Sequence, residues 1–185
     1  MVLNNPWKVS FDTAWGGPGE IQFDTLTDWS VNSNDGIKYY SGRAVYRCTF
    51  TLPPEKYNKK LYRYYLGTGV IHNLAKVRLN GEDAGILWTN PWETEITGML
   101  KEKENLLEIE VINLWINRLI GDEAEAWDGI ENGRWPDWLI KGEQRPTRRY
   151  TFTTHRYYKK DDSLSPSGLK GPVRILSVAR KTGSN

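Results

Sequence analysis

The clearest alternation of apolar and polar residues lies in the middle of the chain. In segment 76–80, Val77 and Leu79 alternate with polar neighbours, which is the period-two pattern of a strand with one buried face. Asn80-Gly81 ends this segment, and both residues accept a positive φ, which favours a type I′ turn. Segment 84–88 can then return antiparallel, so the pattern predicts a β-hairpin.

The same alternation predicts strands on both sides of this hairpin. It is strongest in 43–52 and 107–111, and it also predicts shorter strands at 7–11, 20–23, 61–66, 93–97, 149–153 and 172–179. Segment 25–42 is rich in turn-forming residues and is predicted to be a loop, with Leu26 and Trp29 pointing inward. Segment 113–145 has no strand alternation and is predicted to be a long loop, of the kind that is usually functional.

These patterns together predict the fold class. About ten short strands, with turn signals between them and no convincing amphipathic helix, indicate an all-β fold: a two-sheet antiparallel β-sandwich of jelly-roll type, with little helix. A length of 185 residues suits one domain, and no linker divides the chain, so we expect a single domain over 1–185. Residues 181–185 are expected to form a loose tail.

Composition narrows the possible functions. The chain has 9 Trp and 10 Tyr but 4 Phe, so its rings favour interfaces and wet clefts as well as cores. A net charge of +2 indicates neither a nucleic-acid nor a membrane partner, and the basic segment 141–160 is interpreted as the outer face of a strand. We expect no membrane span and no signal peptide within this chain. Cys48 has no partner for a disulfide and is expected in the core.

An ordered set of motifs resembles a known family. YYSGRAVYRCTFTLP, LNG, ITGMLK and ENLLEIEV, at 39–53, 79–81, 96–101 and 104–111, resemble the sugar-binding β-sandwich of glycoside hydrolase family 2. The match tightens over WGGPGEIQFDTLTDWS, GIKYYSG, NLWINRLIGDE and SGLKGPVRI, at 15–30, 36–42, 113–123 and 167–175. With these motifs, nearly the whole chain resembles the C-terminal galactose-binding-like domain of large Bacteroidetes enzymes related to α-L-rhamnosidases of glycoside hydrolase family 106.

The resemblance implies a noncatalytic accessory domain of an exported glycoside hydrolase that degrades plant or host polysaccharides. Its expected partners are carbohydrate and the parent's catalytic barrel, and its expected location is periplasmic or secreted. The family's catalytic carboxylates would lie in that barrel, so no catalytic residue is carried onto this chain and no cofactor is required. Two alternatives stay open: a catalytically active glycosidase fragment, and a purely structural interdomain module.

Two aromatic groups are candidate carbohydrate-binding residues, because a sugar needs a flat apolar face with polar groups beside it. Trp88, Asn90 and Trp92 surround one turn, although Trp at strand ends also caps cores. Arg134 lies among Trp127, Trp135 and Trp138 in the long loop. Those three rings could equally be a patch that packs on the catalytic barrel.

Charged residues suggest further roles. Arg118 is expected to pin the long loop by binding Asp122 or Glu123. Carboxylate pairs on open strand faces have no cause for a raised pKa, which disfavours catalysis by this chain. A structural calcium ion is a further hypothesis, and its candidate oxygen ligands are Asp24, Asp28, Asp161 and Asp162.

Overall fold

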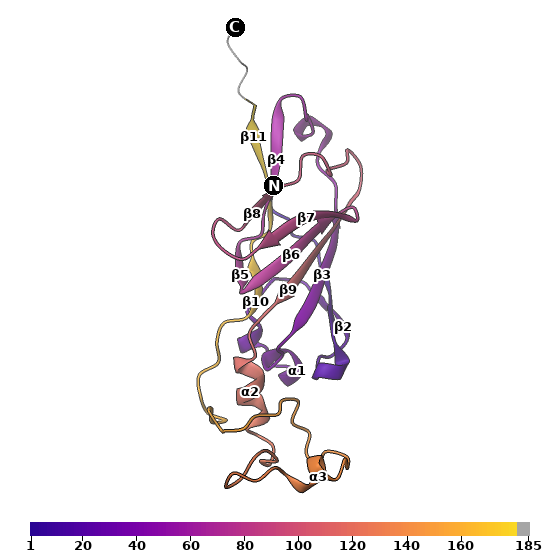
Figure 1. The fold of residues 1–185 in the computed structure, drawn as a ribbon. Helices are drawn as coiled ribbons and strands as arrows, with labels where there is room; N and C mark the ends of the chain where they lie inside the picture. Colours follow the sequence, from indigo (N-terminus) through magenta and orange to yellow (C-terminus); the bar gives the residue numbers. More distant parts are fainter. Residues whose placement is uncertain (181–185) are drawn as a thin grey trace.

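The computed structural model describes residues 1–180 and has a β-sandwich with an irregular extension at one end (Figure 1). The first layer is a six-stranded antiparallel sheet with the order β2-β1-β3-β9-β6-β7. Its strands are β2 (Glu20–Phe23), β1 (Trp7–Phe11), β3 (Arg43–Phe50), β9 (Asn105–Ile112), β6 (Leu74–Leu79) and β7 (Glu82–Leu87).

The second layer consists of two short antiparallel ladders. One is β11-β4-β8, and the other is β10-β5; their bounds are β11 (Arg174–Ala179), β4 (Tyr62–Gly67), β8 (Glu93–Glu95), β10 (Gly168–Gly171) and β5 (Val70–His72). The chain passes from β4 to β5, and from β10 to β11, through two residues each time, so the ladders continue one another. The predicted all-β antiparallel sandwich is confirmed.

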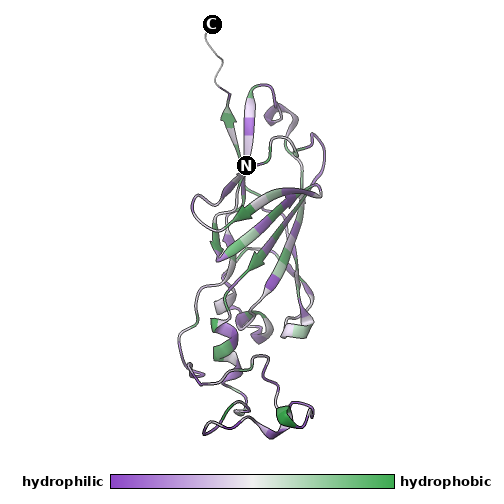
Figure 2. Cartoon of the chain, viewed as in Figure 1, coloured by the Kyte–Doolittle hydropathy of each residue, from purple (hydrophilic) through white to green (hydrophobic). Residues whose placement is uncertain are grey.

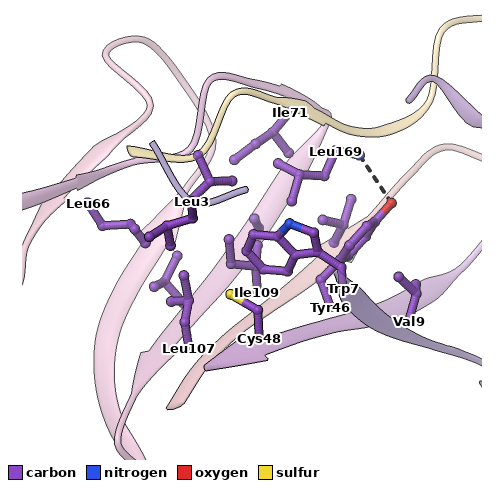
Figure 3. Close-up of a cluster of buried hydrophobic side chains, with 14 of the residues drawn as sticks. Leu3, Trp7, Val9, Tyr46, Cys48, Leu66, Ile71, Leu107, Ile109 and Leu169 are labelled. Carbon is purple, nitrogen blue, oxygen red and sulfur yellow. Dashed lines mark hydrogen bonds between the residues drawn. The ribbon is translucent and has the colours of Figure 1, made fainter. Parts of the chain in front are cut away.

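The core lies between the two layers. Hydropathy alternates along the strands (Figure 2), and the predicted inward residues Leu107, Ile109 and Val111 are fully buried. Cys48 is buried among them, as expected. Figure 3 shows Tyr46 in this core, where its hydroxyl accepts a hydrogen bond from the Leu169 amide of the opposite layer. The core therefore joins the two layers by polar as well as apolar contacts.

The central hairpin forms as predicted. β6 and β7 pair antiparallel, and Asn80 and Gly81 have φ values of 55° and 85° between them. The Asn80 side chain donates hydrogen bonds to the Met99 carbonyl and to Asn105 Oδ1, and it accepts one from the Leu106 amide. This turn is therefore tied to the start of β9 as well as to its own two strands.

Within residues 1–180, helical structure is minor, as predicted, and consists of short segments. These are η1 (Thr13–Trp15), η2 (Trp29–Val31), α1 (Asp35–Lys38), η3 (Pro54–Lys56), α2 (Ile116–Asp122) and α3 (Asp137–Ile140). The helix α2 was not predicted. Its buried face carries the polar residues Asn117, Arg118 and Asp122 beside Ile120, so no apolar periodicity marks it. No helix within residues 1–180 is long and apolar enough to cross a membrane.

The predicted strand at 149–153 is wrong. The amides of Tyr150 and Thr151 donate to Asp122 Oδ2 at 2.9 and 2.7 Å, so a side-chain carboxylate takes the place of a neighbouring strand. The short strands β5 and β10 were missed because each lies in a glycine-containing connection. The predicted tail, residues 181–185, lies outside the part of the chain that the structure describes.

Candidate functional site

Residues 113–167 form an irregular extension, here called the lobe, which leaves the sandwich after β9 and returns to it at β10 (Figure 1). Its first element, α2, carries Arg118 four residues before Asp122. Arg118 Nε lies 3.0 Å from Asp122 Oδ1, and the guanidinium stacks 4.9 Å from the ring centre of Tyr150. The predicted contact of Arg118 with Asp122 is confirmed, and it is Asp122 that holds the loop, through the Tyr150 and Thr151 amides.

Two further buried carboxylates hold the lobe together. Glu123 Oε1 accepts from Arg149 Nη2 at 2.5 Å, and its Oε2 accepts from Arg156 Nε at 2.8 Å. Burial by itself would raise the pKa of Glu123, but the hydrogen bonds and positive charges of these two arginines outweigh burial and lower it. Glu123 is therefore a stable anion at neutral pH.

Asp128 plays the same role on the other side of the lobe. It accepts two hydrogen bonds from the Arg145 guanidinium, at 2.6 and 2.8 Å, and a third from the Thr147 hydroxyl. Burial favours a raised pKa here as well, yet the Arg145 and Thr147 hydrogen bonds and the charges of Arg145 and Arg149 lower the pKa of Asp128. The two carboxylates thus organise four charged or polar loop residues.

The arginines of this network also cover two of the indole rings. Arg149 and Arg156 lie 5.1 and 5.8 Å from the ring centre of Trp127. Arg145 lies 5.6 Å from that of Trp138, whose Nε1 donates to the Asp128 carbonyl. Cation–π contacts of this kind are attractive, so Trp127 and Trp138 belong to the framework of the lobe.

A hollow of about 600 Å³ opens on the surface of the lobe. Its lining residues are Trp127, Asp128, Gly129, Glu131, Asn132, Arg134, Trp135, Pro136 and Asp137. Three predicted binding residues therefore meet here, Trp127, Arg134 and Trp135, whereas Trp138 does not line the hollow. One wall is a tight turn, which is closed by a backbone β-bridge between Glu131 and Arg134.

Trp135 is the most accessible aromatic surface of this hollow. Its ring is stacked on Phe152, with ring centres 5.9 Å apart and an interplanar angle of 5°, yet 53% of the residue remains exposed. Phe152 thus covers one face of the Trp135 ring, and the other face is open to solvent. The exposed Arg134, Glu131 and Asp137 side chains provide hydrogen-bond donors and acceptors around it.

The other predicted group is only partly brought together. Asn90 and Trp92 line a second hollow, of about 520 Å³, beside the ladder β11-β4-β8. Trp88 lines neither hollow and is 71% exposed. The Asn-Pro turn therefore separates the two rings that the sequence suggested would lie at one site.

The proposed calcium ligands, Asp24, Asp28, Asp161 and Asp162, do not form a recognisable metal-binding group among residues 1–180. Asp28 accepts hydrogen bonds from Ser30 and from the Ser167 amide, which ties the end of the lobe to the sandwich. Within residues 1–180, no group of three or more His, Cys, Asp or Glu side chains could hold a metal ion. The calcium ion stays a prediction.

Sequence reasoning missed the carboxylate–arginine network. The basic segment 141–160 was interpreted as a solvated strand face, which is wrong for Arg149, because this residue is buried against Glu123. A usable signal was the presence of Asp122, Glu123 and Asp128 ahead of an arginine-rich segment in a region without strand alternation. The wall of the first hollow also had a signal, since Asn132-Gly133 repeats the turn-forming pair seen at Asn80-Gly81.

Comparisons with known proteins add an independent finding. No family model matches the chain. The chain is 39% identical over 188 residues to a Formosa agariphila protein provisionally named beta-glucuronidase, a match that covers 98% of this chain and 16% of that protein. Its fold is similar to that of a rhamnosidase from Novosphingobium sp. PP1Y, with a TM-score of 0.78, 32% identity, and coverage of 96% of this chain and 15% of that one.

A β-glucuronidase from Ruminococcus gnavus is also similar in fold, with a TM-score of 0.50 and 19% identity over 61% of this chain and 22% of that one. This likeness concerns the fold alone. The resemblance to part of a rhamnosidase-like glycoside hydrolase is confirmed. The chain spans about one sixth of the length of the Formosa agariphila protein and of the Novosphingobium rhamnosidase.

Proposed function

We propose that this chain is a noncatalytic accessory domain of a larger glycoside hydrolase of the α-L-rhamnosidase or family 2 type, where it contacts glycan and braces the catalytic barrel. One observation carries the proposal: matches that cover 96–98% of this chain account for 15–16% of proteins named as glycosidases. In this proposal the parent enzyme is periplasmic or secreted and degrades polysaccharide.

The lobe hollow is the proposed site of saccharide contact. The open face of Trp135 suits the C–H side of a pyranose ring, and Arg134, Glu131 and Asp137 can reach its hydroxyl groups. Binding of this kind, by stacking and a few exposed hydrogen bonds, is expected to be millimolar to micromolar, or about 4 to 8 kcal/mol.

The charges of the lobe favour a noncatalytic role. Glycoside hydrolysis requires a carboxylic acid with a raised pKa facing a second carboxylate across the sugar. The buried carboxylates Glu123 and Asp128 instead have lowered pKa values and are bound by arginines. Their geometry supports structural anions, so the alternative of a catalytically active fragment is disfavoured.

A second candidate function, a structural module without ligand, is favoured by a different surface. Trp15 and Trp115 are 42% and 44% exposed and contact each other edge to face, with ring centres 5.3 Å apart. They lie where the lobe meets the sandwich and line neither of the two hollows. Exposed indole pairs are typical of protein interface cores, so this surface is the proposed contact with the catalytic barrel.

Titration with oligosaccharides tests the saccharide role. We expect intrinsic Trp fluorescence to change on binding, and Trp135→Ala to weaken affinity about tenfold, since loss of one stacked ring costs about 1.4 kcal/mol. Trp88→Ala is the matched control, because Trp88 is more exposed but lines neither hollow. Equal loss in both variants, or no response to any saccharide, would contradict this role.

The catalytic alternative has its own measurement. The chain alone is expected to release no nitrophenol from nitrophenyl α-L-rhamnoside or nitrophenyl galactoside. Turnover that survives purification, and that is lost when a carboxylate is replaced by its amide, would instead show that the chain is catalytically active.

A further inference from the structure

The hollow beside the ladder β11-β4-β8 shares no lining residue with the lobe hollow and is a separate site. Glycine and proline backbone, one indole and two charged side chains surround it. Its lining residues are Gly67, Gly69, Val70, Asn90, Pro91, Trp92, Glu93, Gly171, Pro172, Arg174 and Leu176.

Strand register explains why this hollow exists. Arg174 pairs with Gly67 across β11 and β4, and Gly67 pairs with Glu93 across β4 and β8, so the three residues form one row. Gly67 has no side chain, and a Cβ built there would lie 3.5 Å from Leu176 Cδ1 and 3.7 Å from Glu93 Cγ. The missing side chain therefore leaves a floor of backbone between a guanidinium and a carboxylate.

The wall formed by Trp92 is held in place before any ligand binds. The amide and hydroxyl of Thr68 both donate to the Trp92 carbonyl, at 2.9 and 3.1 Å. The Glu93 amide donates to the Pro91 carbonyl at 2.8 Å, and the Trp92 ring packs against the core. A site fixed in this way loses little conformational freedom on binding.

The two charged residues of the row have hydrogen-bonding capacity to spare. Arg174 and Glu93 are exposed, and neither forms an ion pair within residues 1–180. One supplies only donors and the other only acceptors, and their charges cancel. A ligand that offers both hydroxyl donors and hydroxyl acceptors, and carries no charge, would satisfy both.

We propose that this groove binds a neutral saccharide. The C–H face of one pyranose ring lies against Trp92 and Leu176 over the Gly67 floor, and its hydroxyls donate to Glu93 and accept from Arg174. A hexuronate fits less well, because its carboxylate would be repelled by Glu93 as well as attracted by Arg174, so entry into the groove would cost its hydration without a net gain from charge. The inference rests on the proposed carbohydrate role but concerns a different part of the molecule.

Nuclear magnetic resonance of the intact chain tests the proposal. We expect the methyl glycosides of L-rhamnose or D-galactose to shift the Trp92 indole N–H signal in a saturable way, and D-glucuronate to shift it much less. Gly67→Leu fills the floor and is expected to weaken binding at least tenfold. Arg174→Gln, at an exposed position, removes the positive charge of the groove without filling its floor. It is also expected to weaken binding.

The two saccharide sites can fail separately. Trp135→Ala should leave the Trp92 response unchanged, whereas Gly67→Leu should leave the lobe response unchanged. Neutral glycosides that leave the Trp92 signal unmoved, or that bind Gly67→Leu and Arg174→Gln as well as the unmodified chain, would overturn the groove proposal without touching the lobe. A stronger response to D-glucuronate than to neutral sugars would overturn its stated ligand class.

Discussion

At the scale of single residues, burial decides what a charge pair is worth. Arg118–Asp122 and Asp137–Lys141 are both spaced i,i+4 on helices at similar distances, but the first pair is buried and the second is largely exposed. Asp122 also accepts hydrogen bonds from two backbone amides and from the Thr151 hydroxyl. Its removal leaves a buried guanidinium and three donors without a partner.

Asp122→Ala is therefore expected to lower the free energy of unfolding by about 3 to 5 kcal/mol. Asp137→Ala, the control with the same spacing, is expected to change it by no more than about 0.5 kcal/mol. Urea denaturation followed by circular dichroism measures both. Similar midpoints for the two variants would mean that the Asp122 contacts do not stabilise the fold.

At the scale of elements, two Asn-Gly turns have the same backbone but different surroundings. Asn80 and Asn132 have φ values of 55° and 48°. The Asn80 side chain makes three hydrogen bonds that tie the β6–β7 turn to Met99, Asn105 and Leu106. That of Asn132 makes none among the described residues. The Asn80 turn therefore connects elements, whereas the Asn132 turn only reverses the chain.

Asn80→Ala is expected to destabilise the protein by about 2 to 4 kcal/mol, through lost hydrogen bonds and a strained positive φ. Asn132→Ala is expected to cost about 1 kcal/mol, from the backbone alone. Thermal unfolding of the two variants measures the difference. An equal shift of the melting temperature would show that the turn conformation, and not the side-chain contacts, sets the cost.

These elements also show what the sequence could predict. Strands such as β3 and β9 were predictable because the neighbouring layer buries every second side chain, and these buried positions are occupied by apolar residues. The segment 149–153 alternates in the same way, but its amides bind Asp122, a contact across 28 residues that no local pattern encodes. The helix α2 could not be predicted from hydrophobic periodicity, because its buried face is mostly polar.

The candidate sites were predictable in residue type but not in geometry. Aromatic residues in a long loop indicated a recognition surface, yet nothing in their spacing separates Trp135, with an open face, from Trp138, whose indole N–H donates inside the lobe. Arg174 lies 81 positions from Glu93, and only the register of three strands brings them to one row. That register depends on the whole sheet.

At the scale of the whole molecule, the sandwich and the lobe are stabilised by different forces. Apolar side chains fill the space between the two layers of the sandwich. The lobe depends on Glu123, Asp128 and their arginines, and its return to the sandwich depends on Asp28. Hydrophobic burial is insensitive to pH, whereas the carboxylate contacts require ionised groups.

Acidification is therefore expected to release the lobe before the sandwich. Burial would raise the pKa of Asp28, Glu123 and Asp128, but hydrogen bonds and arginine or lysine charges lower all three. A carboxyl group with a lowered folded-state pKa adds stability above its unfolded-state pKa, about 4, and that stability is lost as the pH falls through the folded-state value.

Hydrogen exchange measured by mass spectrometry from pH 7 down to about pH 3, with the exchange times corrected for the intrinsic rate, follows both parts at once. Amides at 118–124 and 147–151 should lose protection at a higher pH than those of β3 and β9. In Glu123→Gln the arginines keep a neutral acceptor that cannot titrate, so the lobe is expected to be less protected at neutral pH and to change less on acidification. Simultaneous loss of protection in lobe and sandwich would mean that the charges are not what holds the lobe.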